Sequence, residues 1–179
     1  FRSIHHLPIL DPAIPGYLKA AKEAGCITSA DMCTNLGNTP TEMVIESCKY
    51  LDYLIPSEGE VRDLFGEDWT PQSAAETLRS WGVKHVVIKL GDKGCYIKDD
   101  EFDEFVPSFR VKAIDTTGAG DSFAGGLLTG VLRGWSLKKS AIFGAATGCI
   151  AVQSLGANTG VKSYEQVLAV AKTSPDWEG

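Results

Sequence analysis

The chain has 179 residues, of which 44% are hydrophobic and 22% are charged, proportions typical of a globular domain and not of a disordered segment. Its 17 basic and 23 acidic residues give a formal net charge of −6, and the basic residues form no run. An acidic chain of this kind argues against binding to nucleic acid or to a membrane surface. No apolar stretch reaches membrane-spanning length, and the first residues do not read as a signal peptide.

The five cysteines are scattered along the chain and form no CxxC pair. An odd, scattered set is typical of reduced thiols and not of a disulfide framework or a zinc site. We therefore expect a cytoplasmic protein with free thiols at Cys26, Cys33, Cys48, Cys95 and Cys149.

The first half of the chain alternates between helical and strand patterns. Pro, Ser and Thr stand where helices would begin, and Gly stands where several would end. Short apolar runs bounded by Asp or Pro predict buried strands. The predicted helices span 11–24, 41–48, 58–65 and 71–81, and the predicted strands span 26–30, 53–55 and 85–90.

The second half begins with a predicted hairpin. The sequence GDKG at residues 91–94 is typical of a turn, and residues 95–98 would form the returning arm. Short strands are predicted at 102–106 and 110–113. They are followed by a long predicted helix after Gly120, a second from Leu137 to about Val152 and a third from Tyr164 to Ala171.

Strands that alternate with helices predict a single α/β domain, residues 1–179, built around a largely parallel sheet. Ligands of such sheets bind beyond the carboxyl ends of the strands. Asp31, Ser57, Lys89 and the segment 115–121 each follow a predicted strand, so we expect them along one rim of the sheet.

The most informative motif is DTTGAGD at residues 115–121, which is followed by SFAGGLL. Gly118 and Gly120 allow a tight loop, and the apolar run predicts a helix that begins there. The free N–H groups and the dipole of a helix N-terminus favour an anion, and Asp121 would place a carboxylate beside it. Together these features suit phosphoryl transfer to a hydroxyl, in which amides hold the transferring group and a carboxylate takes the proton. The simpler alternative is an Asp that only caps the helix.

The full motif resembles the signature of the ribokinase-like (PfkB-type) carbohydrate kinase family. The resemblance implies a three-layer α/β/α fold and an ATP-dependent kinase that phosphorylates a hydroxyl of a sugar or sugar-like acceptor. It also implies that Asp121 is the catalytic base and that Gly118, Ala119 and Gly120 form the anion hole.

Two further segments resemble the nucleotide-binding motifs of this family. Ser57 and Glu60 match its N-x-x-E motif, which helps to place Mg²⁺ and the phosphates, with Ser57 in place of the usual Asn. Helix capping explains the same two residues equally well. Lys89, Gly91 and Gly94 match a T-x-G-x-x-G strand end that lies against the phosphates. Lys89 replaces the Thr, and it could neutralise phosphate charge or extend to solvent. For GDKG alone, a plain hairpin turn is the alternative.

The resemblance also implies a K⁺ site and an adenine pocket. Without the resemblance, the sequence SLGANTG at residues 154–160 would predict only a loop. Gly144 stands where some relatives carry a polar residue beside the adenine, and Asp31 and Asn35 resemble a D-x-N-x-R strand end without its Arg. The implied cation ligands are Asp115, Thr117, Ser154, Gly156 and Gly160.

The resemblance covers only the carboxyl-terminal half of the family, from about residue 11 to residue 171. The chain begins at Phe1 without Met, so we expect a fragment that lacks the N-terminal part and the lid over the sugar, with an exposed sheet edge. Two alternatives to an active sugar kinase stay open: a catalytically incomplete nucleotide-binding fragment that needs its N-terminal half, and a nucleoside kinase of the same fold. The implied partners are a small-molecule sugar or nucleoside acceptor and, in the full-length protein, a second copy as a homodimer.

Overall fold

The computed structural model describes residues 4–9, 11–32 and 41–177 of the chain. The chain forms two compact units. Unit 1 comprises residues 1–89 and 96–104, and unit 2 comprises residues 90–95 and 105–179. The chain therefore passes from one unit to the other three times, each time within or beside a β-hairpin.

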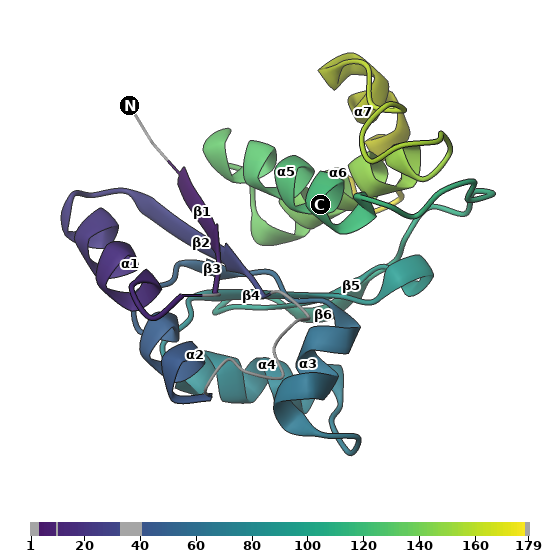
Figure 1. The fold of residues 1–179 in the computed structure, drawn as a ribbon. Helices are drawn as coiled ribbons and strands as arrows, with labels where there is room; N and C mark the ends of the chain where they lie inside the picture. Colours follow the sequence, from purple (N-terminus) through teal and green to yellow (C-terminus); the bar gives the residue numbers. More distant parts are fainter. Residues whose placement is uncertain (1–3, 10, 33–40, 178–179) are drawn as a thin grey trace. The chain divides into compact units, whose positions relative to one another are not determined.

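Six strands form one sheet and lie in it in sequence order (Figure 1). They are β1 (Ile4–Pro8), β2 (Ile27–Asp31), β3 (Tyr53–Leu54), β4 (His85–Lys89), β5 (Cys95–Lys98) and β6 (Asp103–Val106). Strands β1 to β4 pair in parallel, which confirms the largely parallel sheet, although β1 was not among the predicted strands. Short turns connect β4 to β5 and β5 to β6, which makes the last two strands hairpin arms and the sheet mixed. The predicted hairpin is thereby confirmed.

The helices of unit 1 begin and end at sequence signals. They are α1 (Ile14–Glu23), α2 (Thr41–Cys48), α3 (Glu58–Phe65) and α4 (Pro71–Ser80). Reciprocal capping boxes join Ser57 to Glu60 before α3 and Thr70 to Ser73 before α4. Helices α2, α3 and α4 lie together on one face of the sheet (Figure 1). The core of this unit consists of apolar side chains that are almost fully buried, among them Leu18, Ala30, Leu54, Val61, Leu78, Val86 and Ile88.

Unit 2 is built from α5 (Ala119–Leu132), α6 (Leu137–Ala151) and α7 (Tyr164–Ala171). Helices α5 and α6 approach closely because glycines line the seam between them. A Cβ on Gly126 would overlap Thr147, and a Cβ on Gly144 would lie 2.9 Å from the carbonyl oxygen of Phe123. Aromatic rings also pack between α6 and α7, where Phe143 lies against Tyr164 with ring centroids 5.4 Å apart.

The predicted strand at residues 110–113 is wrong. Residues 107–113 have no regular structure, and they run along the surface with Val111 41% exposed. A strand of four residues needs a neighbour to pair with and an apolar face to bury. Here Arg110 and Lys112 alternate with small side chains, and the segment is instead attached at its end, where the Ile114 N–H donates to the Val152 carbonyl oxygen at 2.7 Å.

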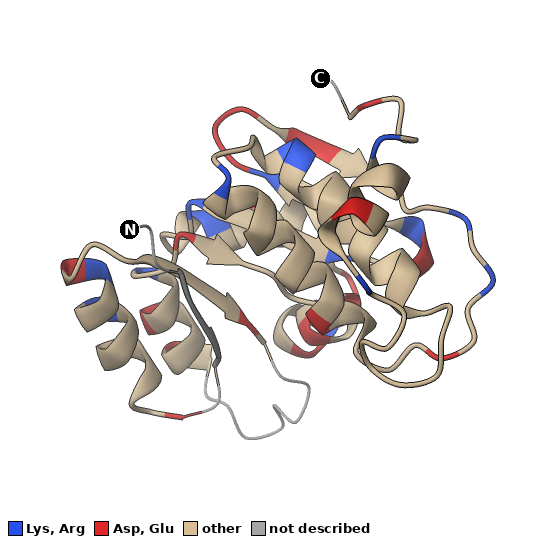
Figure 2. Cartoon of the chain, turned by 90° about the horizontal axis from the view of Figure 1, so that it is seen from above, with Lys and Arg blue, Asp and Glu red and all other residues tan. Residues whose placement is uncertain are grey.

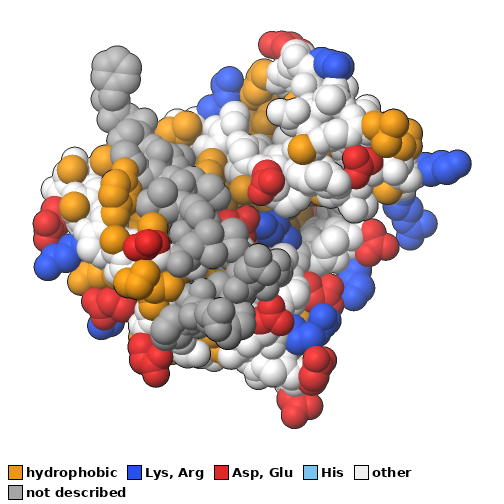
Figure 3. Space-filling model, in the orientation of Figure 1, with side chains coloured by type: hydrophobic (Ala, Val, Ile, Leu, Met, Phe, Trp, Pro, Cys, Tyr) orange, Lys and Arg blue, Asp and Glu red, His pale blue; other side chains and the backbone are white. Residues whose placement is uncertain are grey.

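The surface carries charges of both signs. Figure 2 shows acidic and basic residues interspersed along the helices and loops of each unit, and Figure 3 shows hydrophobic side chains that reach the visible surface. The most exposed large ones are Leu155 at 75% and Ile114 at 62%. Within the described residues, the helices are all too short or too polar to cross a membrane.

The glycine seam provides a stability test with a matched control. Replacement of Gly126 by Ala should destabilise the protein by about 1–3 kcal/mol, because the added methyl group overlaps Thr147 on the facing helix. Replacement of Gly125 by Ala should be neutral or stabilising by up to about 1 kcal/mol, because a Cβ there meets nothing within 4 Å and Ala favours helix. Urea unfolding of the two variants measures the difference. Equal stabilities would show that α5 and α6 are not packed as described.

Candidate functional site

The loop before α5 is fixed by a glycine in the left-handed conformation. Gly118, at the N-cap of α5, has φ 70° and ψ 7°. A Cβ there would lie 2.6 Å from both the Cβ and the carbonyl oxygen of Ala157, so the position requires glycine. The Ala119 N–H closes a turn by donating to the Thr116 carbonyl oxygen at 3.2 Å. Gly120 follows in the first turn, where backbone N–H groups have no partner within the helix.

Asp121 presents an exposed carboxylate at the same helix end. It lies in the first turn of α5, where the helix dipole favours negative charge. The next residue, Ser122, fixes this turn: its N–H donates to the Gly118 carbonyl oxygen at 2.9 Å and its hydroxyl to the Ala157 carbonyl oxygen at 3.3 Å. An anion and a proton acceptor can thus be placed side by side at one helix N-terminus.

Asp115 joins the loop before α5 to the loop after α6. One carboxylate oxygen accepts the Thr117 N–H at 2.9 Å, and the other accepts the Gly156 N–H, also at 2.9 Å. These bonds, with that of Gly156 the larger contributor, lower the pKa of the Asp115 carboxyl below its ordinary value. The Asp115 N–H donates to the Val152 carbonyl oxygen at 3.2 Å. The signature loop is therefore held from both sides.

Ser154 and Gly160 lie together in the loop after α6. A Cβ on the buried Gly160 would come 2.5 Å from the Ile150 carbonyl oxygen and 3.2 Å from the Ser154 hydroxyl oxygen. The absence of a side chain at Gly160 thus lets this loop fold back on the end of α6. With Asp115, Thr117 and Gly156, these residues place hydroxyl, carboxylate and carbonyl oxygens in one region of unit 2, and oxygen is the ligand type that hard cations prefer.

Gly91 and Gly94 form the turn between β4 and β5. Gly91 has φ 62° and is exposed, with open space where a Cβ would lie. Gly94 has φ 105°, and a Cβ there would overlap the Val106 carbonyl oxygen and lie 2.7 Å from the Ser108 nitrogen. The Leu90 N–H donates to the Gly94 carbonyl oxygen at 2.8 Å. Gly94 is therefore required by close packing, whereas Gly91 leaves its backbone open to an incoming group.

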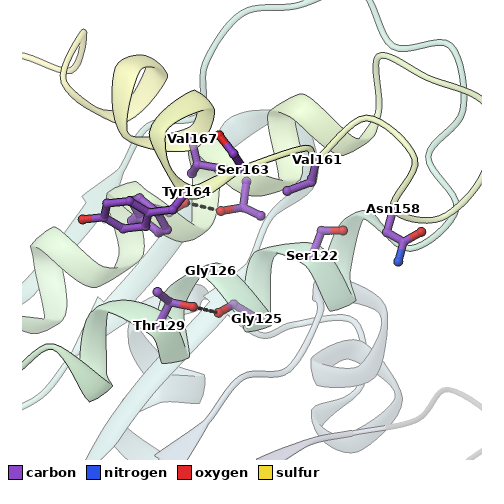
Figure 4. Close-up of a pocket in the computed structure, with 11 residues that line it drawn as sticks. Ser122, Gly125, Gly126, Thr129, Asn158, Val161, Ser163, Tyr164 and Val167 are labelled. Atoms are coloured by element: carbon purple, nitrogen blue, oxygen red, sulfur yellow. Dashed lines mark hydrogen bonds between the residues drawn. The ribbon is translucent and has the colours of Figure 1, made fainter.

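A pocket of about 400 Å³ lies between α5, α6 and the start of α7. Figure 4 shows Ser122 and Thr129 on one wall and Ser163, Tyr164 and Val167 on the other. None of its lining residues is charged, and the lining combines apolar side chains with a few hydroxyl and amide groups. The lining consists of Ser122, Gly125, Gly126, Thr129, Phe143, Thr147, Asn158, Val161, Ser163, Tyr164 and Val167.

Gly144 faces α5 within the glycine seam and is buried. It is not among the residues that line the pocket, whereas Phe143 and Thr147 of the same helix are. The Thr147 hydroxyl donates to the Phe143 carbonyl oxygen at 2.7 Å, which leaves the wall of the pocket on this side mostly apolar.

In unit 1, Ser57 and Glu60 form the capping box of α3. The Glu60 carboxylate accepts the Ser57 N–H at 2.6 Å, and the Ser57 hydroxyl accepts the Glu60 N–H at 3.4 Å. Glu60 is only 5% exposed. Burial raises the pKa of its carboxyl, and the hydrogen bonds from Ser57 offset part of this effect. Ser57 and Glu60 therefore cap α3, and Glu60 also places a buried carboxyl group beside the carboxyl end of β3.

Lys89 is paired with Asp31. The Lys89 ammonium lies 2.5 Å from one Asp31 carboxylate oxygen, and the other oxygen accepts the Met32 N–H at 3.0 Å. The two side chains are 13% and 14% exposed. On the backbone, Lys89 bridges to Ser57, and its N–H donates to the Pro56 carbonyl oxygen at 2.8 Å. Lys89 therefore does not extend to solvent.

Part of the expected rim forms in unit 1, where β2, β3 and β4 bring Asp31, Ser57, Glu60 and Lys89 together at their carboxyl ends. The segment 115–121 was expected on the same rim because a strand was predicted before it, but residues 107–113 form no strand. Unit 2 holds the other predicted site residues. In the described part of the chain, no three His, Cys, Asp or Glu side chains cluster closely enough to hold a metal ion by themselves. Asn35 and Cys33 lie outside the described residues, and Cys26, Cys48, Cys95 and Cys149 are not joined in disulfides.

Sequence reasoning missed two features of the site. The first is the Asp31–Lys89 pair, whose partners are 58 residues apart in the sequence. The sequence feature that could have indicated the pair is that each residue ends a strand. The second is the pocket wall at Ser163, Tyr164 and Val167, for which the sequence offers only an N-cap and an amphipathic helix.

Comparison with known proteins identifies what the chain is similar to. Residues 17–163 match the profile of the pfkB family carbohydrate kinases. The chain is 33% identical to a fructokinase of Solanum tuberosum over 174 residues, which are 92% of this chain and 53% of that protein. Its fold is similar to that of ribokinase from Thermotoga maritima, with a TM-score of 0.80, 36% identity and coverage of 95% of this chain and 57% of the other.

A second solved structure is aminoimidazole riboside kinase from Salmonella enterica, which was crystallised with aminoimidazole riboside and an ATP analogue. The TM-score is 0.82 at 27% identity, with coverage of 96% of this chain and 64% of that one. The chain thus spans about half the length of the relatives it matches.

The hydrogen bonds of Asp115 predict a pH-dependent contribution to stability. A carboxyl group whose pKa is lowered by folding stabilises the protein above its unfolded pKa, about 3.9, and this contribution is lost as the pH falls through the lower folded value. Asp115→Asn should therefore unfold at lower urea concentration than the unmodified chain at pH 7, and the gap should narrow as the pH falls below about 4. Urea titrations of both proteins at pH 7 and pH 3 measure this difference in unfolding midpoint. A gap independent of pH would mean that the charge of Asp115 does not hold the two loops.

Proposed function

Because the chain belongs to the pfkB family of carbohydrate kinases, we propose that it supplies the phosphoryl-transfer machinery of an ATP-dependent kinase whose acceptor is a hydroxyl of a sugar or sugar-like molecule. The observation that supports this most strongly is the start of α5. There an exposed Asp121 follows a left-handed Gly118 in a loop that Asp115 holds from both sides.

In the proposed reaction, Asp121 accepts the proton of the acceptor hydroxyl. The hydroxyl oxygen forms a bond to the γ-phosphorus of ATP while the bond from that phosphorus to the bridging oxygen breaks, which releases ADP. The backbone N–H groups at Gly118, Ala119 and Gly120 stabilise the negative charge of the transferring group. They need no reorganisation, because the Asp115 bonds already fix the loop.

The residues present are compatible with Mg²⁺ and a nucleotide. We assign Glu60 to Mg²⁺ through bound water, because one of its oxygens is engaged by Ser57 and because Mg²⁺ keeps several waters in protein sites. When bound, Mg²⁺ neutralises phosphate charge. Lys89 and the open backbone of Gly91 are assigned to the phosphates. Gly94 then acts by permitting the tight turn.

We assign a K⁺ site to the region where Asp115, Thr117, Ser154, Gly156 and Gly160 gather. The oxygen donors there suit a hard cation. A cation in this place would strengthen the connection between the two loops without touching the acceptor. We also propose that residues 1–179 act as one nucleotide-binding α/β domain and that the adenine lies beside α6, where Gly144 permits the close approach of α5.

The acceptor is a sugar in our proposal because a fructokinase is 33% identical over nearly the whole chain. A nucleoside-like acceptor is the second candidate, since aminoimidazole riboside kinase shares the fold at 27% identity. A third candidate, a nucleotide-binding portion that needs further polypeptide to turn over, follows from the half-length coverage of the relatives.

Calorimetric titration of the 179-residue chain with a non-hydrolysable ATP analogue tests the nucleotide site. Binding should require Mg²⁺, and it should tighten when Na⁺ is replaced by K⁺. Glu60→Gln should weaken the Mg²⁺-dependent binding several-fold while the helix stays capped, because Gln still accepts the Ser57 N–H. A folded chain that binds no nucleotide under any of these conditions would refute the proposed site.

Asp121→Asn tests the base. The variant should bind the ATP analogue as the unmodified chain does, whereas ADP release with sugar or nucleoside acceptors should fall by about 10²–10⁴-fold, the usual contribution of general-base catalysis. If the unmodified chain turns over only after an N-terminal half from a relative is added, the comparison is made in that mixture. Unchanged turnover in Asp121→Asn would rule out its role as base.

A further inference from the structure

The Asp31–Lys89 pair is a tightly held pair of opposite charges in unit 1, beside the assigned phosphate region. The Asp31 carboxylate is held by the Met32 N–H on one oxygen and by the Lys89 ammonium on the other. The Lys89 backbone is fixed in turn by the Pro56 carbonyl and by the bridge to Ser57. Neither side chain is free to rearrange without breaking these contacts.

Fold stability does not explain such a pair. Transfer of two charges out of water costs about as much as their attraction returns, and apolar replacements of similar size are often as stable. The pair also stands at the carboxyl ends of β2 and β4, the side of a parallel sheet where ligands bind. Because stability does not require the pair, its position is the observation that points to a role in ligand binding.

The charge balance of the cluster is unfavourable to a bare anion. Asp31 and Lys89 cancel, and Glu60 lies close enough that the charges of both act on its carboxyl group. The three groups sum to −1 when Glu60 is ionised and to zero when it is protonated, and never to a positive value. A phosphate that reaches the Lys89 ammonium must therefore approach the Asp31 carboxylate as well, at a Coulombic cost.

We propose that Asp31 makes polyphosphate binding at the carboxyl ends of β2, β3 and β4 depend on a divalent cation, because its carboxylate occupies the Lys89 ammonium and repels metal-free phosphate. Polyphosphate bound to Mg²⁺ carries less negative charge and brings a cation toward the two carboxyl groups. Asp31 is then a specificity-determining residue that rejects uncomplexed nucleotide. This inference rests on the proposed assignment of Lys89 to the phosphates.

The test uses inorganic tripolyphosphate as the probe, titrated calorimetrically into the folded chain with Mg²⁺ and with EDTA. The unmodified chain should bind the probe far more tightly with Mg²⁺. In Asp31→Asn, the affinity for metal-free tripolyphosphate should rise by about tenfold or more, because the competing charge is gone. The ratio of the affinity with Mg²⁺ to the affinity with EDTA should therefore be smaller than in the unmodified chain. A gain of this kind does not follow from damage to the fold.

Two further variants control for net charge and for the role of Lys89. Asp52→Asn removes one negative charge from a carboxylate that is 13% exposed and paired with Lys22 at 2.5 Å, but at the amino end of β3. Asp52→Asn should leave the ratio of the affinities with Mg²⁺ and with EDTA unchanged. The double variant Asp31→Leu/Lys89→Met keeps the packing and removes both charges, so it should show no gain.

The outcomes separate this inference from the proposed function. If Asp31→Asn shows no gain, or the same gain as Asp52→Asn, the inference is overturned, and binding of the Mg²⁺-bound ATP analogue by the unmodified chain would leave the proposed function standing. If no variant binds tripolyphosphate, the inference is also overturned. A gain specific to Asp31→Asn supports the inference even when the ATP analogue does not bind, in which case the proposed function fails alone.

Discussion

The geometry of unit 2 depends on the two hydrogen bonds that the Asp115 carboxylate accepts from Thr117 and Gly156. Each joins a loop to the same rigid acceptor, so the turn before α5 and the turn after α6 have a fixed distance between them. Gly118 can then sit against Ala157 in a left-handed conformation that no other residue would tolerate. The direction in which α5 begins, and with it the placement of Asp121, follows from this constraint.

The glycine seam extends the same constraint along the helices. Because Gly126 and Gly144 let the two backbones approach, α5 and α6 have little freedom to slide. Helix α7 packs on α6 through the contact of Phe143 with Tyr164. A carboxylate positioned on such a rigid helix can meet the geometric demands of proton transfer, which tolerate little displacement.

In unit 1, charged side chains at the carboxyl ends of β2, β3 and β4 are held by ion pairing and hydrogen bonds. The Asp31–Lys89 pair is largely shielded from solvent and Glu60 is buried, so the positions of these groups are set by electrostatics, by hydrogen bonds and by the register of β2, β3 and β4. Glu60 serves the fold as the cap of α3 while it keeps a carboxyl group beside the Asp31–Lys89 pair. Helix capping and ligand binding are therefore compatible roles for one residue.

Local signals in the sequence were sufficient for much of this structure. The bounds of α3 at Glu58 and Phe65 follow from Ser57 and Gly66, and the hairpin follows from GDKG. Tertiary features were not accessible in the same way. The pairing of Asp31 with Lys89 depends on the order of the strands in the sheet. Which of Gly125 and Gly126 faces α6 depends on how α5 is rotated about its axis. The strand expected at 110–113 has no partner to pair with among the described residues. The sequence IHHLP at β1 also has no alternation that would have predicted a strand.

The most direct test of the central claim is an amide NMR titration of the isotopically labelled chain with the Mg²⁺-bound, non-hydrolysable ATP analogue. We expect the largest shifts at residues 118–121, with a second group at residues 89–94. Shifts confined to the pocket residues around Tyr164 and Val167, with the N–H groups at the start of α5 unaffected, would contradict the central claim.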